Sequence, residues 1–391
     1  MFLNALVKRN PKLIEASVAL LSQGKILPDS YVIDVDAFID NAKQIKRQAD
    51  KHNIKLYGMT KQFGRNPLLA KILVEQLGYA GIVCVDFKEA RFFQRHGIPV
   101  AHVGHLVQLP ESMLLSTIKR ARPEVMTVTC IEKAKSVSQA ASQLGITQDL
   151  LLKFYQDQDE LYINQESGFA LHELDHVCAQ IEQLPNVRIA GITHFPCMLL
   201  KDGLPKATHN VTTMQAAHHA LLGLGHTVEQ VNMPSFTCCA TLPELARNKA
   251  THAEPGHALT GTTPNNCDGS QTENLAMLYI SEISHHFKGH SYCFGGGYYR
   301  RGNLTNALVL PRTPGTNFSP KYSTITNDDE SSIDYHLKLD GEYPIGAAVV
   351  MAFRSQVFVT RSDVALVKEV QSDAPHLMAL FDALGNEVSN E

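Results

Sequence analysis

The chain has 391 residues, 44% of them hydrophobic and 19% charged, with a formal net charge of −4 at pH 7. This length allows one large domain plus a smaller one, and the weakly acidic balance argues against nucleic acid as a partner. No apolar run reaches the roughly 18 residues of a membrane span, and Lys8, Arg9 and Lys12 make the first residues a poor secretory signal. Eight cysteines without a CxxC pair suit reduced thiols, so we expect a cytoplasmic protein.

The first part of the chain predicts a helical extension followed by a closed barrel. Residues 1–30 place Leu13, Ala16, Leu20 and Leu21 on one helical face. From residue 31, short β-rich runs alternate with helix-length stretches. Counted from Leu56, the runs are 56–60, 81–86, 100–104, 125–129, 150–154, 189–194, 228–233 and 251–254. This repeat predicts a (β/α)8 TIM barrel within residues 31–262.

After Gly261 the helical period disappears, and strands follow one another through turns rich in Gly, Pro and Asn. The β-rich runs there are 275–284, 291–294, 307–310, 335–339, 347–353 and 357–360. They predict a mostly β C-terminal domain over residues 263–391, closed by a short helix at 376–384. The predicted fold is therefore α/β, a barrel followed by a β domain.

Lys61 is the first candidate for chemistry. The strand 56–60 ends directly before it, and Gly64, Asn66 and Pro67 then stop the strand. The C-terminal end of a parallel strand is the face on which barrels place their catalytic groups. A solvated lysine that merely closes a strand is the alternative interpretation.

The stretch THAEPGHALTG, residues 251–261, places a carboxylate at the end of the last barrel strand. Glu254 is followed by a turn with Gly256 and His257, whose backbone N–H groups are suited to an anion. Ser235 and Thr237 are hydroxyl donors in the preceding loop, and phosphate sites in barrels often lie in these last loops. A phosphorylated aldehyde cofactor would suit this set, with an imine to Lys61 and a pyridinium proton held by Glu254.

Several motifs in order resemble the alanine racemase N-terminal domain family, the fold-type III barrel that uses pyridoxal 5'-phosphate. They are VIDVDAFIDNAKQI leading to Lys61, THFP at 193–196, EPGHALTG at 254–261 and CFGGGYYRRG at 293–302. Within that fold the chain is most similar to the YhfX-like group. The resemblance implies a Lys61 Schiff base, a homodimer with shared active sites and an amino-acid substrate. It also implies that His194 lies near the cofactor ring and that Arg65 takes the place of a phosphate-binding tyrosine.

The chain departs from alanine racemases at the residue facing the pyridine nitrogen. Those racemases have arginine in an RPG motif, whereas this chain has Glu254, as the fold-type III decarboxylases do. A carboxylate there keeps the ring charged, which strengthens it as an electron sink. Glu166 in QESGF also replaces the family's arginine. Both changes argue against simple alanine specificity.

Three functions follow from the resemblance. The first is an amino-acid racemase or epimerase, in which Lys61 serves one face of Cα and Tyr292 or Cys293 of a partner chain serves the other. The second is a lyase similar to D-threonine aldolase or D-serine dehydratase, or a decarboxylase. The third is a cofactor carrier without turnover, against which the additional β domain counts. No metal site is expected, because the pairs His218-His219 and His285-His286 are typical of surface or helix residues.

Overall fold

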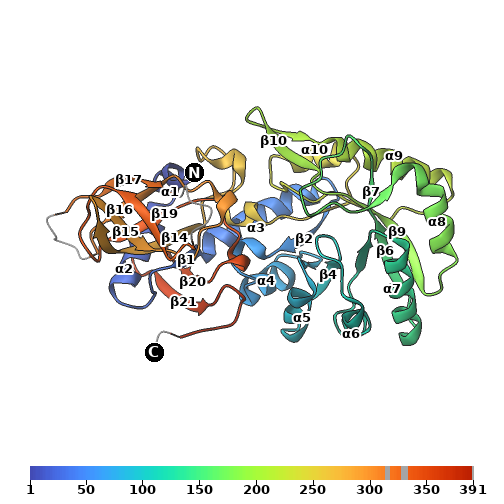
Figure 1. Cartoon of the computed structure of the whole chain (residues 1–391), viewed down its shortest axis with the longest axis horizontal. Helices are drawn as coiled ribbons and strands as arrows, with labels where there is room; N and C mark the ends of the chain where they lie inside the picture. Colours follow the sequence, from blue (N-terminus) through green and yellow to red (C-terminus); the bar gives the residue numbers. More distant parts are fainter. Residues whose placement is uncertain (313–317, 327–332, 390–391) are drawn as a thin grey trace. The chain divides into compact units, whose positions relative to one another are not determined.

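The structure is a computed structural model that describes residues 1–312, 318–326 and 333–389 (Figure 1). The chain divides into two compact units. The sheet unit comprises Met1–Ala42, Lys61–Asn66 and His257–Glu391, and the barrel unit comprises Lys43–Thr60 and Pro67–Gly256. The chain therefore leaves the barrel unit directly before Lys61 and again directly before His257.

The barrel unit contains a closed sheet of parallel strands in the order β12-β13-β2-β3-β4-β5-β6-β9. The strands are β2 (Lys55–Met59), β3 (Gly81–Val83), β4 (Val100–Val103), β5 (Val125–Val128), β6 (Gln148–Leu152), β9 (Val187–Thr193), β12 (Gln230–Asn232) and β13 (His252–Ala253). Each of the eight runs predicted from Leu56 onwards contains or overlaps one of them. The predicted TIM barrel is confirmed.

Helices follow the strands along the outside of this barrel (Figure 1). They are α4 (Pro67–Lys71) with η2 (Ile72–Gln76), α5 (Phe87–Arg95), α6 (Glu111–Ala121), α7 (Ile131–Leu144), α8 (Leu174–Glu182), α9 (His209–Gly223) and α10 (Leu242–Arg247). A further helix, α3 (Val35–Asp50), precedes β2. The sequence sets their ends locally. Asp86 caps α5 by accepting a hydrogen bond from the Glu89 N–H at 2.8 Å, and Gly145 ends α7 in the left-handed conformation. Two small ribbons, β7 (Phe154–Tyr155) with β8 (Phe169–Ala170) and β10 (Met198–Lys201) with β11 (Leu204–Ala207), extend the barrel loops.

The sheet unit is built on a nine-stranded sheet in the order β15-β18-β17-β16-β19-β14-β1-β20-β21. Its strands are β1 (Ser30–Asp34), β14 (Met277–Phe287), β15 (His290–Phe294), β16 (Asn306–Leu310), β17 (Lys321–Thr326), β18 (His336–Asp340), β19 (Ala348–Met351), β20 (Asp363–Lys368) and β21 (His376–Phe381). β1 lies inside this sheet, antiparallel to β14 and parallel to β20. The predicted C-terminal β domain is therefore confirmed, and a strand from before the barrel completes it.

The predicted N-terminal helices are α1 (Leu3–Arg9) and α2 (Pro11–Ser22), whose apolar faces form one buried cluster with strands of the sheet. The predicted helix at 376–384 is wrong. Residues His376–Phe381 form β21, which pairs antiparallel with β20. A short apolar segment fits either period, and the unpaired edge of β20 decides in favour of a strand. The predicted run 357–360 is likewise a 3-10 turn, η7 (Val357–Val359). None of the helices in the described ranges has the length and hydropathy needed to cross a membrane.

Candidate active site

The predicted site residues Glu254 and Lys61 follow two neighbouring strands of the barrel, β13 and β2, whose ends are joined by a backbone hydrogen bond. β13 pairs in parallel with β2, and beyond the strands the Met59 N–H donates to the carbonyl oxygen of Pro255 at 3.0 Å. Glu254 directly precedes Pro255, and Lys61 comes two residues after Met59 in the chain. Barrel closure therefore brings together segments that lie about two hundred residues apart in the sequence.

Glu254 is a buried carboxylate whose two oxygens have different surroundings. Its side chain is 1% exposed, and Oε1 accepts hydrogen bonds from His102 Nδ1 at 2.8 Å and Asn232 Nδ2 at 2.7 Å. Oε2 is buried and has no hydrogen-bond partner within the described part of the chain. Burial by itself raises the pKa of Glu254, but the charge of His105 and the contacts with His102 and Asn232 together lower it to about 2. The structure thus favours an ionised carboxylate with one unsatisfied oxygen.

His102 links Glu254 to Thr127 by hydrogen bonds inside the barrel. Its Nε2 lies 2.7 Å from the Thr127 hydroxyl on β5, and its ring lies 5.2 Å from that of His105, measured between centroids. Because Glu254 is ionised, Nδ1 is the donor in that contact, and Nε2 shares a hydrogen bond with the Thr127 hydroxyl. Sequence reasoning missed His102 and Asn232. A usable signal existed, since polar side chains inside the runs VAHV and QVN are unusual for strands buried on both faces.

A second polar cluster surrounds Asp159, in the loop after β7. The Asp159 side chain is fully buried and accepts from His194 Nε2 at 3.0 Å, His209 Nδ1 at 2.8 Å and the Thr213 hydroxyl at 2.7 Å. Burial works to raise the pKa of Asp159, but the hydrogen bonds from His194, His209 and Thr213 outweigh it and lower the pKa well below its ordinary value. The sequence showed no motif at Asp159.

Both ring nitrogens of His194 are in use. Nε2 faces Asp159, while Nδ1 accepts from the Phe195 N–H at 2.8 Å and from Asn210 Nδ2 at 3.1 Å. Burial lowers the pKa of His194 although Asp159 opposes it, which fits a neutral ring with its proton on Nε2. In this arrangement His194 can offer a ligand the face of its ring, but no ring nitrogen.

A buried lysine lies in the same barrel unit. Lys153, directly after β6, is 3% exposed and donates to the Ser167 hydroxyl at 3.0 Å. Burial lowers the pKa of the Lys153 amine. Glu166, which replaces the family's arginine, is exposed beside Ser167.

In the sheet unit, the segment that carries Lys61 is anchored from both sides. Lys61 opens the turn η1 (Lys61–Phe63), and the Gln62 carbonyl accepts from the Ser355 hydroxyl at 3.0 Å. Arg65 is 7% exposed, and its guanidinium lies 5.4 Å from the centre of the Phe358 ring. The lysine predicted from its place after a strand therefore belongs to a fixed turn.

In the same unit, His257 lies near two positively charged side chains, Arg354 and Lys61. Its Nε2 accepts from Arg354 Nε at 3.2 Å, and its Nδ1 lies 3.2 Å from the Thr262 hydroxyl. Burial, followed by the charges of Arg354 and Lys61, lowers the pKa of His257 well below its ordinary value. Lys61 and Arg354 thus share an environment that suits an anion. Arg354 was missed because the stretch FRSQ resembles no anion-binding motif.

The predicted hydroxyl donors of the last loops have partners within the protein. The Ser235 hydroxyl donates to the Met198 carbonyl at 2.7 Å, and Thr237 Oγ1 accepts from the Glu254 N–H at 3.2 Å. Thr237 therefore helps to orient Glu254 and can still donate its own hydrogen. Gly256 is buried at the end of the barrel unit.

Tyr292 and Cys293, predicted as proton donors, lie on opposite faces of β15. Cys293 is fully buried, and burial raises the pKa of its thiol to about 12. Tyr292 is half-buried and stacks on His285 with ring centroids 4.8 Å apart. Of the two, Tyr292 is the side chain with access to solvent. Among the residues described, no group of three or more His, Cys, Asp or Glu side chains is placed to hold a metal ion.

A closed parallel barrel with a lysine and a carboxylate after neighbouring strands, joined to an antiparallel β unit, defines the alanine-racemase-like class of proteins. The chain belongs to the family of the alanine racemase N-terminal domain, whose model matches residues 33–264. The YhfX-like C-terminal domain matches residues 278–377. Across 99% of this chain and 100% of the relative, it is 50% identical to the uncharacterized protein YhfX of Escherichia coli (strain K12).

Solved structures share the fold at low identity. D-threonine aldolase from Filomicrobium marinum superposes with a TM-score of 0.67 at 16% identity, covering 91% of this chain and 95% of that one. Alanine racemase from Clostridium difficile 630 has a TM-score of 0.65 at 16% identity, covering 92% and 99%. D-threo-3-hydroxyaspartate dehydratase from Delftia sp. HT23 has a TM-score of 0.65 at 14% identity, covering 90% and 96%.

Proteins of this fold family are generally pyridoxal-phosphate enzymes, typically homodimers that act on amino acids, and they include racemases, aldolases and dehydratases. The residues present fit that cofactor. In the barrel unit, Glu254 Oε2 is the acceptor that a protonated pyridine nitrogen needs. In the sheet unit, the Lys61 amine suits an aldehyde and the Arg354 guanidinium suits an anionic group.

Proposed function

We propose that the protein is a pyridoxal-phosphate-dependent racemase or epimerase that acts at Cα of an amino acid. The observation that carries the proposal is the unpartnered, buried Oε2 of Glu254. Leaving an ionised oxygen buried without a donor costs free energy, so a ligand that supplies an N–H there is favoured. Because His102 and Asn232 occupy Oε1, the carboxylate has one oxygen left for such a donor.

The remaining roles are assigned to the chain's own residues. When bound, the cofactor withdraws electrons from the substrate and makes its Cα proton acidic. Lys61 would hold the cofactor covalently through its amine and exchange a proton with one face of Cα. Arg65 and Arg354, with the Gly256 N–H and the Thr237 hydroxyl, would hold its phosphate, whereas the Ser235 hydroxyl already donates to Met198 and His257 Nε2 accepts from Arg354. His194, with its nitrogens engaged, would pack through its ring face.

Tyr292 is proposed as the proton donor for the opposite face, supplied by the second chain of a homodimer. It is preferred to Cys293 because a fully buried thiol with a raised pKa is poorly placed to exchange protons. The glycines that follow β15 at residues 295–297 are buried, and a Cβ at Gly296 would lie 1.9 Å from Asp29, so these glycines allow close packing within the chain itself.

Covalent attachment is tested by reducing the purified protein with borohydride and mapping the modified peptide by mass spectrometry. We expect a yellow protein whose absorbance band is lost on reduction and whose label is on Lys61. Lys55→Ala, at the exposed start of β2, is the matched control and should label normally. Labelling of a Lys61→Ala protein would refute the assignment.

Reaction type is tested by incubating the protein with L- and D-amino acids in heavy water. A racemase incorporates deuterium at Cα and gives the same mixture from either enantiomer. Release of a keto acid or an aldehyde without racemisation would instead support the second candidate, a lyase. That candidate is favoured by one observation, because an ionised Glu254 keeps the ring charged and so also assists bond cleavage at Cβ.

The shared site is tested by mixing two inactive variants. Lys61→Ala and Tyr292→Phe chains, co-refolded in equal amounts, should recover about a quarter of the wild-type activity, since about half of the dimers carry one intact site of two. A mixture that exchanges subunits and remains inactive would place the second donor within the same chain.

A further inference from the structure

A cavity of about 340 Å³ lies between α9 and α10, on the outer side of the barrel wall. β12 forms its floor. Gln230 and Asn232 of this strand face the barrel interior, where they contact Tyr57 and Glu254. Side chains alternate along a strand, so Val231 and Met233 face outwards into the cavity. The floor is apolar, and the cavity is separate from the Glu254 site on the inner face of the same strand.

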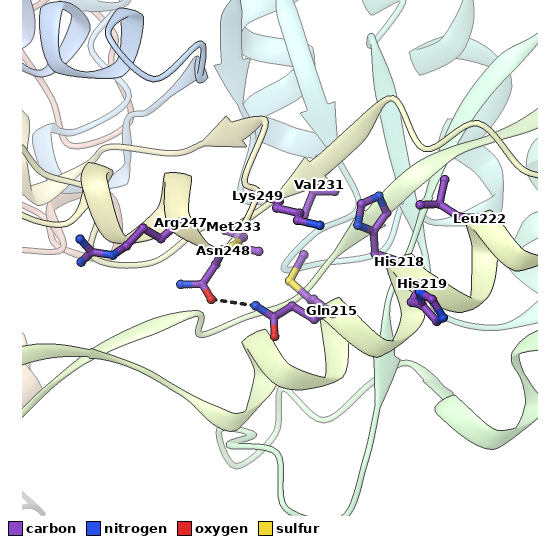
Figure 2. Close-up of a pocket in the computed structure, with 10 residues that line it drawn as sticks. Gln215, His218, His219, Leu222, Val231, Met233, Arg247, Asn248 and Lys249 are labelled. Atoms are coloured by element: carbon purple, nitrogen blue, oxygen red, sulfur yellow. Dashed lines mark hydrogen bonds between the residues drawn. The ribbon is translucent and has the colours of Figure 1, made fainter.

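The walls of this cavity combine one lysine with histidine N–H donors. His218 comes from α9 and Lys249 from the turn after α10, and Figure 2 shows both among the residues that line the cavity. None of the lining residues, all within the described part of the chain, is acidic. Burial, and then the charges of Lys249 and His219, lower the pKa of His218. Arg247 also lines the cavity, but its guanidinium is paired with Glu244 on α10.

Lys249 and His218 are held by a hydrogen bond between the two segments that carry them. Gln215 Nε2 donates to Asn248 Oδ1 at 2.8 Å, which ties α9 to the end of α10 (Figure 2). Lys249 follows with φ +64°, in the left-handed region where helix ends favour glycine or asparagine. The turn itself does not need a lysine. The side chain is therefore best explained by what it offers to the cavity.

We propose that this cavity binds a small organic anion, with its charged head between Lys249 and His218 and its apolar body over Val231 and Met233. The size is at the lower end for small-molecule sites, which suits a compact ligand. A phosphate monoester and a carboxylate share the required chemistry. The site is distinct from the proposed cofactor site and does not depend on it.

The cavity can be tested with protein labelled at its methionine methyl groups and observed by NMR. Met214 and Met233 line the cavity, whereas Met59 lies on β2 and reports on the barrel interior. The probes are phenyl phosphate and benzoate, with inorganic phosphate and phenol as controls that lack the body or the charge. We expect saturable shifts at Met214 and Met233 with one or both aromatic anions, and binding weaker by about tenfold or more with the controls.

Lys249→Asn removes the charge and keeps a residue that tolerates positive φ. Lys288→Asn, in the β14–β15 turn at φ +48°, is the matched control with the same substitution and charge change. We expect Lys249→Asn and His218→Gln to weaken binding by about tenfold and Lys288→Asn to leave it unchanged. The proposal is overturned if Met214 and Met233 do not shift, if only Met59 shifts, if phenol binds as well, or if Lys249→Asn behaves as Lys288→Asn does.

Discussion

One buried cluster of the sheet unit and the interior of the barrel differ in polarity. The sheet unit packs an almost wholly apolar cluster between its N-terminal helices and its strands, including Leu6, Leu278 and Val350. The barrel unit instead buries polar side chains on strands that would ordinarily be apolar, among them His102 and Asn232. A polar interior adds little stability unless each group is hydrogen-bonded, and it supplies chemistry where one group is left without a partner. An unpartnered polar atom inside the barrel, such as Glu254 Oε2, can therefore serve a ligand, whereas the apolar cluster serves the stability of the sheet unit.

The largest expected effect of a substitution is a loss of turnover at Glu254, inside the barrel. Glu254→Gln keeps the shape and removes the charge, so turnover should fall by about 10²–10³, or roughly 3–4 kcal/mol. Steady-state kinetics measures this effect, and a thermal melt shows that the variant is folded under the assay conditions. Glu124→Gln is the control, because Glu124 contacts Gln230 on the neighbouring strand β12 and has no proposed catalytic role. Equal turnover in the two variants would remove Glu254 from the active site.

Barrel closure is expected to be nearly as sensitive. A Cβ at Gly191 on β9 would lie 1.8 Å from the Gln230 carbonyl oxygen of the adjacent strand β12. Because the backbone cannot yield there, Gly191→Ala should destabilise folding by about 3 kcal/mol. Gly223→Ala, whose Cβ meets nothing within 4 Å, should be neutral within about 0.5 kcal/mol. Urea unfolding of both variants measures the difference, and similar midpoints would contradict it.

The Asp159 cluster should give an intermediate effect. In Asp159→Asn the carboxylate is lost, and the new amide NH₂ faces a ring N–H of either His194 or His209, so that two donors oppose each other. The free energy of unfolding should fall by about 2 kcal/mol. Asp175→Asn, on the exposed face of α8, is the control and should change little. Urea unfolding at pH 7 is the measurement. A barrel that tolerates Asp159→Asn as well as Asp175→Asn would show that the cluster is incidental.

The smallest expected effect is a difference in pH dependence between the units. In the sheet unit, burial raises the pKa of Asp29 from 3.8 to about 6, although Ser362 and Tyr279 donate to it. The folded state then binds more protons than the unfolded state in this window, so stability falls as the pH rises from about 4 to 6. Glu254 has the opposite sign. Its folded pKa of about 2 lies below the ordinary 4.5, so its contribution is lost as the pH falls through that range.

Asp29→Asn should flatten the decline between pH 4 and 6, and Glu254→Gln should flatten the loss below pH 4.5. Urea unfolding at a series of pH values compares the two slopes with those of the wild type. An unchanged slope above pH 4 in Asp29→Asn would show that the carboxyl group is solvated.

The local pattern of apolar residues was sufficient to predict the elements that repeat regularly along the chain. The alternation of short apolar runs with helix-length stretches located all eight barrel strands, because both faces of a parallel strand are covered. The same reasoning failed at His376–Phe381, where the segment is short and the partner strand decides the conformation. It also missed Arg354, whose role depends on a histidine 97 residues earlier in the chain.

The sequence by itself determined the barrel, the C-terminal β domain, the family, and the placement of Lys61 and Glu254 directly after strands. These follow from local periodicity and from motifs in a fixed order. Only the tertiary structure decided which oxygen of Glu254 is satisfied, because its partner His102 lies 152 residues away and meets it through barrel closure. It also decided that Cys293 is buried and that His218 and Lys249 share a cavity. Contacts between distant segments depend on strand order and register, which no local pattern encodes.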